Sequence, residues 1–217
     1  MPKDLAIVGL GAVGANLARR LVASGHSVQL GARRPADLAA LIAELGHAAR
    51  AASPDLACRN AELVFLAVPA HAAVEAVRAA APPAGAILVD CNNPLLFVDG
   101  PIWKPPAEGS TAAQLQAAFP ALRVVKAFNH FGAELHADPM LRGGPADAFV
   151  AGDDAAARQR VLGLAAAMGF VPRDAGPLRN AAVLENLAVL WIQLALHGGL
   201  GREFSFRCEQ RPAGEAR

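Results

Sequence analysis

Three glycines near the start of the chain have the spacing of a phosphate-binding turn. Gly9, Gly11 and Gly14 form the pattern G-x-G-x-x-G, after an apolar run and before a segment of helical composition. In such a turn the first glycine permits a tight bend, the second lets the backbone approach a pyrophosphate, and the third lets helix and strand pack closely. The N–H groups at the helix start then face the anion. This context favours a dinucleotide site over a glycine-rich turn without a ligand.

Two arginines lie where a site for NAD usually carries an acidic residue, about 20 residues past the glycines. Arg33 and Arg34 end the second apolar run, and the first acid, Asp37, comes only after Pro35. Exposed cations before a helix N-terminus are disfavoured by roughly 0.3–1 kcal/mol, and an anion between them would remove this penalty. The pair therefore predicts NADP(H) rather than NAD(H), through its 2′-phosphate; the alternative is a solvated basic turn.

Short apolar runs alternate with segments of helical composition along most of the chain. The runs expected to be strands are residues 5–9, 26–30, 63–68, 87–89 and 124–128, and expected helices span 13–23 and 35–45 and begin again at Ser110-Thr111. Nearly continuous apolar strands separated by helices are typical of a parallel sheet covered on both faces. We predict an α/β fold, a Rossmann-type doubly wound and mostly parallel sheet, with an irregular, proline-rich surface loop at 92–109.

The pattern changes after Gly176. We expect residues 1–175 to form an NADP-binding Rossmann domain and 176–217 a helical segment that packs on it and on a partner subunit. Residues 181–197 are apolar almost all round, and a helix of this kind must be buried on every side. A second copy of the chain is the expected cover. From Gly201 onward the chain becomes charged, which predicts a partly frayed tail.

Composition excludes several classes of protein. The 217 residues are 54% hydrophobic and 18% charged, which excludes disorder, and the net charge of +1 with 5% aromatic residues argues against a nucleic-acid binder. The cysteines, Cys58, Cys91 and Cys208, are scattered without a C-x-x-C pair, so neither a disulfide framework nor a metal site is expected. No secretory leader is recognisable, and Glu185 interrupts the most apolar stretch. We expect a soluble, cytoplasmic protein.

Polar residues follow several predicted strands, and ligands of open α/β sheets bind outside the carboxyl ends of the strands. Asn92 and the pair Asn129-His130 lie at such ends. Asn92 either ends its strand or orients a carboxamide, and His130 is either a supporting polar group, a proton donor or an ordinary loop histidine. No Ser/His/Asp or Cys/His motif is present, as expected where cofactors carry the chemistry. Asp153-Asp154 is predicted to cap a helix, and the remaining histidines are predicted to be structural: His26, His47, His71, His136 and His197.

As a set, these motifs resemble the deazaflavin (coenzyme F-420)-dependent NADP oxidoreductases and the NADPH domain of six-transmembrane metalloreductases. The resemblance runs in order to about Phe206. The segments that carry it are residues 7–14, 24–26, 31–34, 67–69, 125–129, 152–154 and 174–178.

The resemblance implies an NADPH-dependent oxidoreductase that transfers a hydride between NADP(H) and a deazaflavin- or flavin-like acceptor. It also implies a homodimer joined through the C-terminal helix. By this resemblance Leu10, Gly11, Ala12 and Val13 line the pyrophosphate; Ala32, Arg33 and Arg34 line the 2′-phosphate; Val68 and Pro69 lie by the ribose and nicotinamide; and Asn92 or Asn93, Asn129 and Ala133 lie where acceptor and nicotinamide meet.

Two residues depart from the family pattern. Deazaflavin-using members commonly carry a histidine where this chain has Asn129, and an aromatic residue where it has Ala70. The asparagine form is similar to that of broader NADP-binding relatives whose acceptor is a flavin or is unknown. The alternatives are a reductase of a small imine or carbonyl substrate, for which a C-terminal segment of about 40 residues is short, and a non-catalytic NADP(H) sensor or interaction module.

Overall fold

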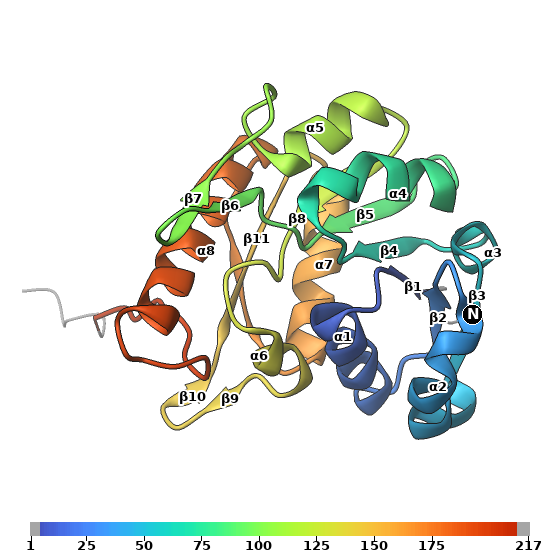
Figure 1. The fold of residues 1–217 in the computed structure, drawn as a ribbon, viewed down its shortest axis with the longest axis horizontal. Helices are drawn as coiled ribbons and strands as arrows, with labels where there is room; N and C mark the ends of the chain where they lie inside the picture. The colour runs from blue at the N-terminus through green and yellow to red at the C-terminus, as the bar shows by residue number, and fades with distance from the viewer. Residues whose placement is uncertain (1–4, 212–217) are drawn as a thin grey trace, which may run out of the picture.

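The computed structural model describes residues 5–211, and these residues form a sheet with helices on both faces (Figure 1). Among them, eight strands join in the order β12-β11-β8-β5-β4-β1-β2-β3. Their bounds are β1 Leu5–Val8, β2 Val28–Gly31, β3 Ala49–Ala52, β4 Leu63–Leu66, β5 Ile87–Asp90, β8 Arg123–Lys126, β11 Asp147–Gly152 and β12 Val171–Asp174. All neighbours are parallel except β11 and β8. The predicted Rossmann-type fold is confirmed.

The sheet is buried on both faces because its strand side chains alternate between two apolar clusters. Leu5 and Ile7 of β1 belong to one cluster, and Ala6 and Val8 belong to the other. Helices α1 and α7 cover the first face, and α3, α4 and α5 cover the second. The helices are α1 Ala12–Ala23, α2 Ala39–Leu45, α3 Pro54–Cys58, α4 Ala73–Ala80, α5 Thr111–Ala118, α6 Ala133–Ala137, α7 Ala155–Ala167 and α8 Ala181–Leu196, with short 3-10 turns η1 Pro35–Leu38, η2 Gly46–Ala48, η3 Ala70–Ala72 and η4 Leu178–Asn180.

Side-chain caps begin two of these helices, as the sequence predicts. The hydroxyl of Ser110 accepts from the N–H of Ala113 at the start of α5, and the Asp154 carboxylate accepts from the N–H of Ala157 in α7. Asp153 differs from the prediction, because its carboxylate accepts from the N–H of Leu178 instead. It therefore ties the start of η4 to the loop that precedes α7.

The prediction of an irregular surface loop at 92–109 is wrong for the middle of this segment, while residues 92–94 and 104–109 contain no helix or strand. Strands β6, Leu95–Phe97, and β7, Pro101–Trp103, form an antiparallel hairpin, with Asp99 and Gly100 at positive φ in its turn. Prolines are tolerated there because a two-stranded ribbon leaves N–H positions unpaired at its edges. A second short hairpin, β9 Met140–Leu141 with β10 Gly144–Pro145, leads into β11. The sequence analysis also missed β3, β11 and β12.

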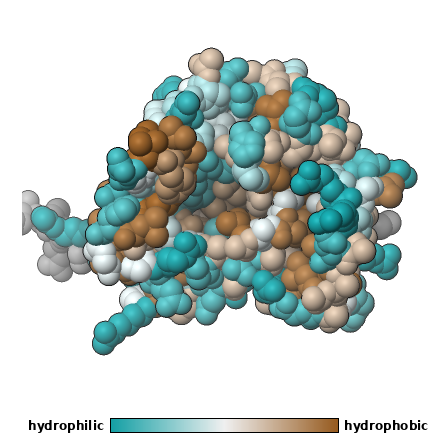
Figure 2. All heavy atoms as spheres, in the orientation of Figure 1, coloured by the Kyte–Doolittle hydropathy of each residue, from teal (hydrophilic) through white to brown (hydrophobic). Residues whose placement is uncertain are grey.

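Helix α8 is not buried on every side within one chain. Its inner face holds Leu184, Glu185 and Trp191, whereas Val183 is 65% and Leu190 48% exposed. Figure 2 shows apolar surface gathered at the left of this view, over α8 and the β6–β7 hairpin. We call this surface the α8 apolar face and define it by the exposed large apolar residues of the hairpin and α8: Leu96, Phe97, Val98, Ile102, Val183, Leu190 and Leu196. No helix among the described residues is long and apolar enough to cross a membrane.

The charged tail is docked rather than frayed where the structure describes it. Trp191 stacks on Phe204 with ring centroids 5.2 Å apart and donates from its indole nitrogen to the Phe204 carbonyl. Farther along, the Cys208 N–H donates to the Asp147 carboxylate. The sequence did not predict these contacts because their partners lie in distant segments. The expectations for residues 1–4 and 212–217 lie outside the described residues.

Candidate dinucleotide site

The three glycines of the turn have three different structural requirements. Gly9 has a φ of +95°, and a Cβ there would lie 2.4 Å from the Ala67 carbonyl oxygen. A Cβ at Gly14 would lie 1.9 Å from the Gly9 oxygen, so strand and helix meet there without space for a side chain. Gly11 is the N-cap of α1, and a Cβ there would meet no atom within 4 Å. Two glycines thus close the turn, and the middle one leaves an open cradle.

The cradle opens into a cavity of about 610 Å³ along the carboxyl ends of β1, β2 and β4. Of the residues predicted to bind a cofactor, seven line it: Gly9, Leu10, Gly11, Ala32, Arg33, Val68 and Pro69. Ala12, Val13 and Gly14 form the first turn of α1, beside the cavity. The sequence analysis missed the opposite wall, where Pro54 joins a row of α4 and η3 residues: Ala72, Glu75, Ala76 and Ala79.

The two predicted arginines differ in position. Arg33 lines the cavity, whereas Arg34 does not. The Arg34 side chain is 82% exposed and forms an ion pair of 2.8 Å with Asp37, one turn further along. Sequence reasoning could not separate the two, because the direction of each side chain depends on the turn into η1.

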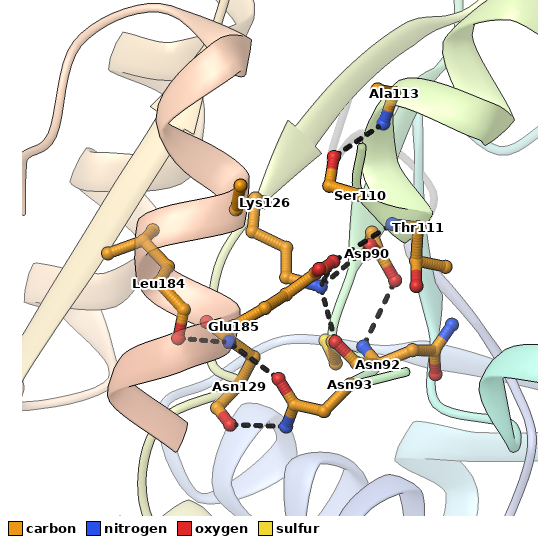
Figure 3. Close-up of polar contacts among 12 residues, drawn as sticks. Asp90, Asn92, Asn93, Ser110, Thr111, Ala113, Lys126, Asn129, Leu184 and Glu185 are labelled. Carbon is orange, nitrogen blue, oxygen red and sulfur yellow. Dashed lines mark hydrogen bonds and ion pairs between the residues drawn. The ribbon is translucent and has the colours of Figure 1, made fainter. Parts of the chain in front are cut away.

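The asparagines at the ends of β5 and β8 meet, as Figure 3 shows. The Asn129 side-chain nitrogen donates to the Asn93 side-chain oxygen over 2.8 Å and to the Leu184 carbonyl of α8 over 2.9 Å. Asn93 donates in return to the Asn129 carbonyl. Asn92 instead donates from its backbone to Asp90. The structure thus brings Asn93 and Asn129 together and joins them to α8.

The residue before Asn129 has an unusual backbone conformation. Phe128 is buried with a φ of +57°, in the left-handed region that is uncommon for a bulky residue. Its ring packs against Phe65 and Phe170, with centroids 5.8 and 5.6 Å away. Surrounding packing of this kind is what holds a strained residue in place. The packed turn fixes the direction in which Asn129 leaves the sheet.

His130 and Ala133 make their contacts with residues other than this asparagine pair. His130 is fully buried, with its Nε2 3.1 Å from the Asp147 carbonyl oxygen and its ring against Phe131 and Phe149. Burial lowers the pKa of His130 to about 4, so the ring is neutral at neutral pH. Ala133 begins α6, and its carbonyl accepts from the Asn16 side chain of α1.

A buried charge network beside the asparagines was missed by the sequence analysis. The Lys126 Nζ lies 2.9 Å from an Asp90 oxygen and 2.9 Å from a Glu185 oxygen, and it also donates to the Asn92 carbonyl (Figure 3). We call Asp90, Lys126 and Glu185 the Lys126 network; all three side chains are fully buried. The sequence held one indication of this network, because Lys126 and Glu185 are each a charged residue within an apolar segment.

Hydrogen bonds and charges support one another in the Lys126 network. Glu185 also accepts from the Thr111 backbone N–H and from the Trp103 indole, both over 3.0 Å. Burial alone would lower the pKa of Lys126, but the two carboxylates outweigh it and raise that pKa above its ordinary value. Lys126 is therefore charged, and Glu185 joins α8 to β8, α5 and the β6–β7 hairpin.

A parallel sheet, a glycine turn that opens a helix and a cavity at the carboxyl ends of the strands together define a Rossmann-type dinucleotide-binding protein. Residues 4–94 match the family model described as NADP oxidoreductase, coenzyme F420-dependent. A putative F420-dependent NADP-reductase from Arthrobacter sp. FB24 is 34% identical, with a TM-score of 0.84 over 95% of this chain and 99% of that one. The chain belongs to this family, and is thereby a member of the NADP-dependent oxidoreductases.

Other relatives extend the comparison. The metalloreductase STEAP3 of Rattus norvegicus is 36% identical over 86% of this chain, but only 37% of that protein is covered. The chain thus spans a little over a third of the length of this curated relative. A reductive aminase from Aspergillus terreus, solved with NADPH and ethyl levulinate, has a TM-score of 0.66 over 92% of this chain and 64% of that one. At 22% identity this likeness concerns the fold alone.

Proposed function

We propose that this chain transfers a hydride between NADP(H) and a deazaflavin- or flavin-like acceptor. The observation that carries the proposal is the cavity that joins the glycine cradle to Arg33 on one side and to Val68 and Pro69 on the other. It connects an anion-binding helix start, a cation for a second phosphate and the end of a central strand. The open space at Gly11 fits a pyrophosphate that approaches the backbone closely.

Each part of the site has a proposed role in holding the cofactor. The backbone N–H groups of Leu10, Gly11, Ala12 and Val13 bind the pyrophosphate, and Ala32 and Arg33 bind the 2′-phosphate, with Arg34 in a lesser role because Asp37 already pairs with it. Val68 and Pro69 lie by the ribose and nicotinamide. Asn92, Asn129 and Ala133 surround the place where the acceptor meets the ring.

The chain's contribution to the reaction is positioning and exclusion of water. When bound, NADPH supplies the hydride, so the protein needs no nucleophile. Asn129, fixed by Asn93 and the Leu184 carbonyl, forms a rigid polar wall for the acceptor. His130 is a neutral, buried ring that supports the turn before Asn129, and it transfers no proton. Rigid placement of this kind supplies much of the rate gain in bimolecular transfers.

The acceptor is tested by mixing the purified protein with NADPH and a panel of oxidants. We expect NADPH absorbance to fall when a deazaflavin, FMN or FAD is added, and not with cyclic imines or ketones. Turnover only with imines or ketones would favour the small-substrate reductase. Binding without turnover across the whole panel, ferric chelates and quinones included, would favour the sensor.

Arg33→Ala is expected to weaken NADPH binding about 5–150-fold and leave NADH binding nearly unchanged, because a hydrogen bond to a charged group is worth about 1–3 kcal/mol. Arg34→Ala is the matched control, since Arg34 already has Asp37 as a partner and lies outside the cavity. It should change NADPH binding less than about threefold. Calorimetric titration of both variants measures this difference. Equal losses for NADPH and NADH in Arg33→Ala would contradict the role of Arg33.

We further propose that residues 176–217 join two copies of the chain through the α8 apolar face. Leu190→Arg places a charge in its middle and should convert a dimer to a monomer. Leu56→Arg is the matched control, because Leu56 is 51% exposed on α3, outside the α8 apolar face. Sedimentation velocity measures the outcome. A monomeric parent protein, or a dimer that persists in Leu190→Arg, would refute the proposed interface.

The cysteines support a further proposal, that the protein works in the reducing cytoplasm. Cys58, Cys91 and Cys208 are all free, and burial raises the pKa of the Cys58 thiol to about 12. A thiol of this kind packs as a small apolar group rather than as a nucleophile.

A further inference from the structure

The charges of the Lys126 network do not balance. Asp90 and Glu185 each contribute −1 and Lys126 contributes +1, so the network carries −1 if both carboxyl groups are ionised. The hydrogen bonds indicate that they are. Asp90 accepts from the Asn92 N–H and from Lys126, and Glu185 accepts from Lys126, Thr111 and Trp103. If either carboxyl group were protonated, its O–H would point at one of these donors instead of at an acceptor.

Water cannot screen this excess charge well. The three side chains of the network are fully buried, and salt screens buried charges much less than exposed ones. The buried rings of His130 and His136 do not offset it, because burial lowers the pKa of both and keeps them neutral. The field of the network therefore extends into the neighbouring part of the site.

The Lys126 network lies at the same sheet edge as the cavity. Leu66 of β4 is in register with Asp90 of β5, which is in register with Lys126 of β8. Directly after Leu66, Ala67, Val68 and Pro69 line the cavity. Adjacent strands lie about 4.8 Å apart, so the two charged strand ends are roughly one and two strand spacings from this end of the cavity.

We propose that the excess negative charge of the Lys126 network makes the site favour the oxidised cofactor over the reduced one. The inference rests on the proposed function, in which the nicotinamide lies by Val68 and Pro69. The oxidised ring carries a positive charge that the reduced ring lacks; the two forms differ by one hydride, which the flavin-like acceptor receives. Asp90 and Glu185 thus bias transfer from NADPH toward the acceptor. A unit charge at about 10 Å and an effective dielectric near 20 changes relative affinity by about tenfold or somewhat more.

The experiment compares the Kd of NADP⁺ with that of NADPH by calorimetry, in the wild type and in Glu185→Gln. The variant removes the excess charge and keeps the size of the side chain. We expect the ratio of the NADP⁺ Kd to the NADPH Kd to rise about tenfold. Asp90→Asn makes the same charge change on the other carboxylate and should shift the ratio the same way. Trp103→Phe removes a donor to Glu185 without changing any charge, and should leave the ratio unchanged.

The outcomes separate this inference from the proposed function. A wild-type protein that binds neither nucleotide would refute the proposed function. If the wild type binds both and the charge variants weaken both equally, the Lys126 network is only structural and the inference is overturned. If neither charge variant folds, the wild-type ratio decides: NADP⁺ bound at least as tightly as NADPH supports the inference, and tighter NADPH binding overturns it.

Discussion

Lys126→Met is expected to lower the free energy of unfolding by about 3–5 kcal/mol, the usual cost of removing one partner from a buried ion pair. The methionine side chain has nearly the length of lysine, so the loss comes from charge rather than volume. It leaves Asp90 and Glu185 buried without their shared cation. Urea unfolding followed by tryptophan fluorescence measures the change, since the Trp103 indole donates to Glu185.

Lys104→Met is the control for this experiment. Lys104 is exposed after β7, and a surface substitution of this kind changes stability by about 0.5 kcal/mol or less. A Lys126→Met protein within about 1 kcal/mol of the parent would mean that the carboxylates find other partners or take up protons. The description of the Lys126 network as two ionised carboxylates around one cation would then be wrong.

The second large effect is expected at Gly14. A Cβ at this position would lie 1.9 Å from the Gly9 carbonyl oxygen, a backbone atom that cannot move without opening the turn. Gly14→Ala should therefore cost about 3 kcal/mol of stability, at the upper end for an overpacked site. It should also abolish NADPH binding, because the displaced turn forms the cradle. Thermal unfolding with and without NADPH measures both effects.

Gly163→Ala should have the opposite sign. Gly163 lies inside α7, and a Cβ there would meet no atom within 4 Å. Alanine at an open helical position stabilises by about 0.5–1 kcal/mol because glycine loses more backbone entropy on folding. If both variants were stabilised, the close approach of α1 to Gly9 would be refuted.

The parts of the fold that the sequence predicted are those encoded locally. The strand at Leu63–Leu66 is a continuous apolar run, and the glycine turn needs only six residues after a strand. By contrast, β12 reads Val-Pro-Arg-Asp, and only its pairing with β11 makes it a strand. The β6–β7 hairpin was missed for the same reason. Its prolines are typical of a loop, and only the pairing of the two strands around the turn at Asp99-Gly100 makes it a hairpin.

The candidate site was predictable to the same extent. The glycines and Arg33 are close in sequence to the strands that position them, so their presence at one sheet edge followed from the fold class. The pairing of Lys126 with Glu185 spans 59 residues, and no local pattern indicates which distant carboxylate will meet a buried lysine. The α4 wall of the cavity was missed because its alanines carry no chemical signal.

The origin of Glu185 in α8 has a consequence for biosynthesis. Lys126 can meet Asp90 while the chain is still being made, but its second carboxylate follows 59 residues later. Until the ribosome has released α8, Lys126 has only Asp90 as a carboxylate partner, and the Trp103 indole and the Thr111 N–H lack the Glu185 carboxylate that accepts from them. The native arrangement is thus completed late in translation, and stalling between β12 and α8 should leave a nascent polypeptide that recruits chaperones.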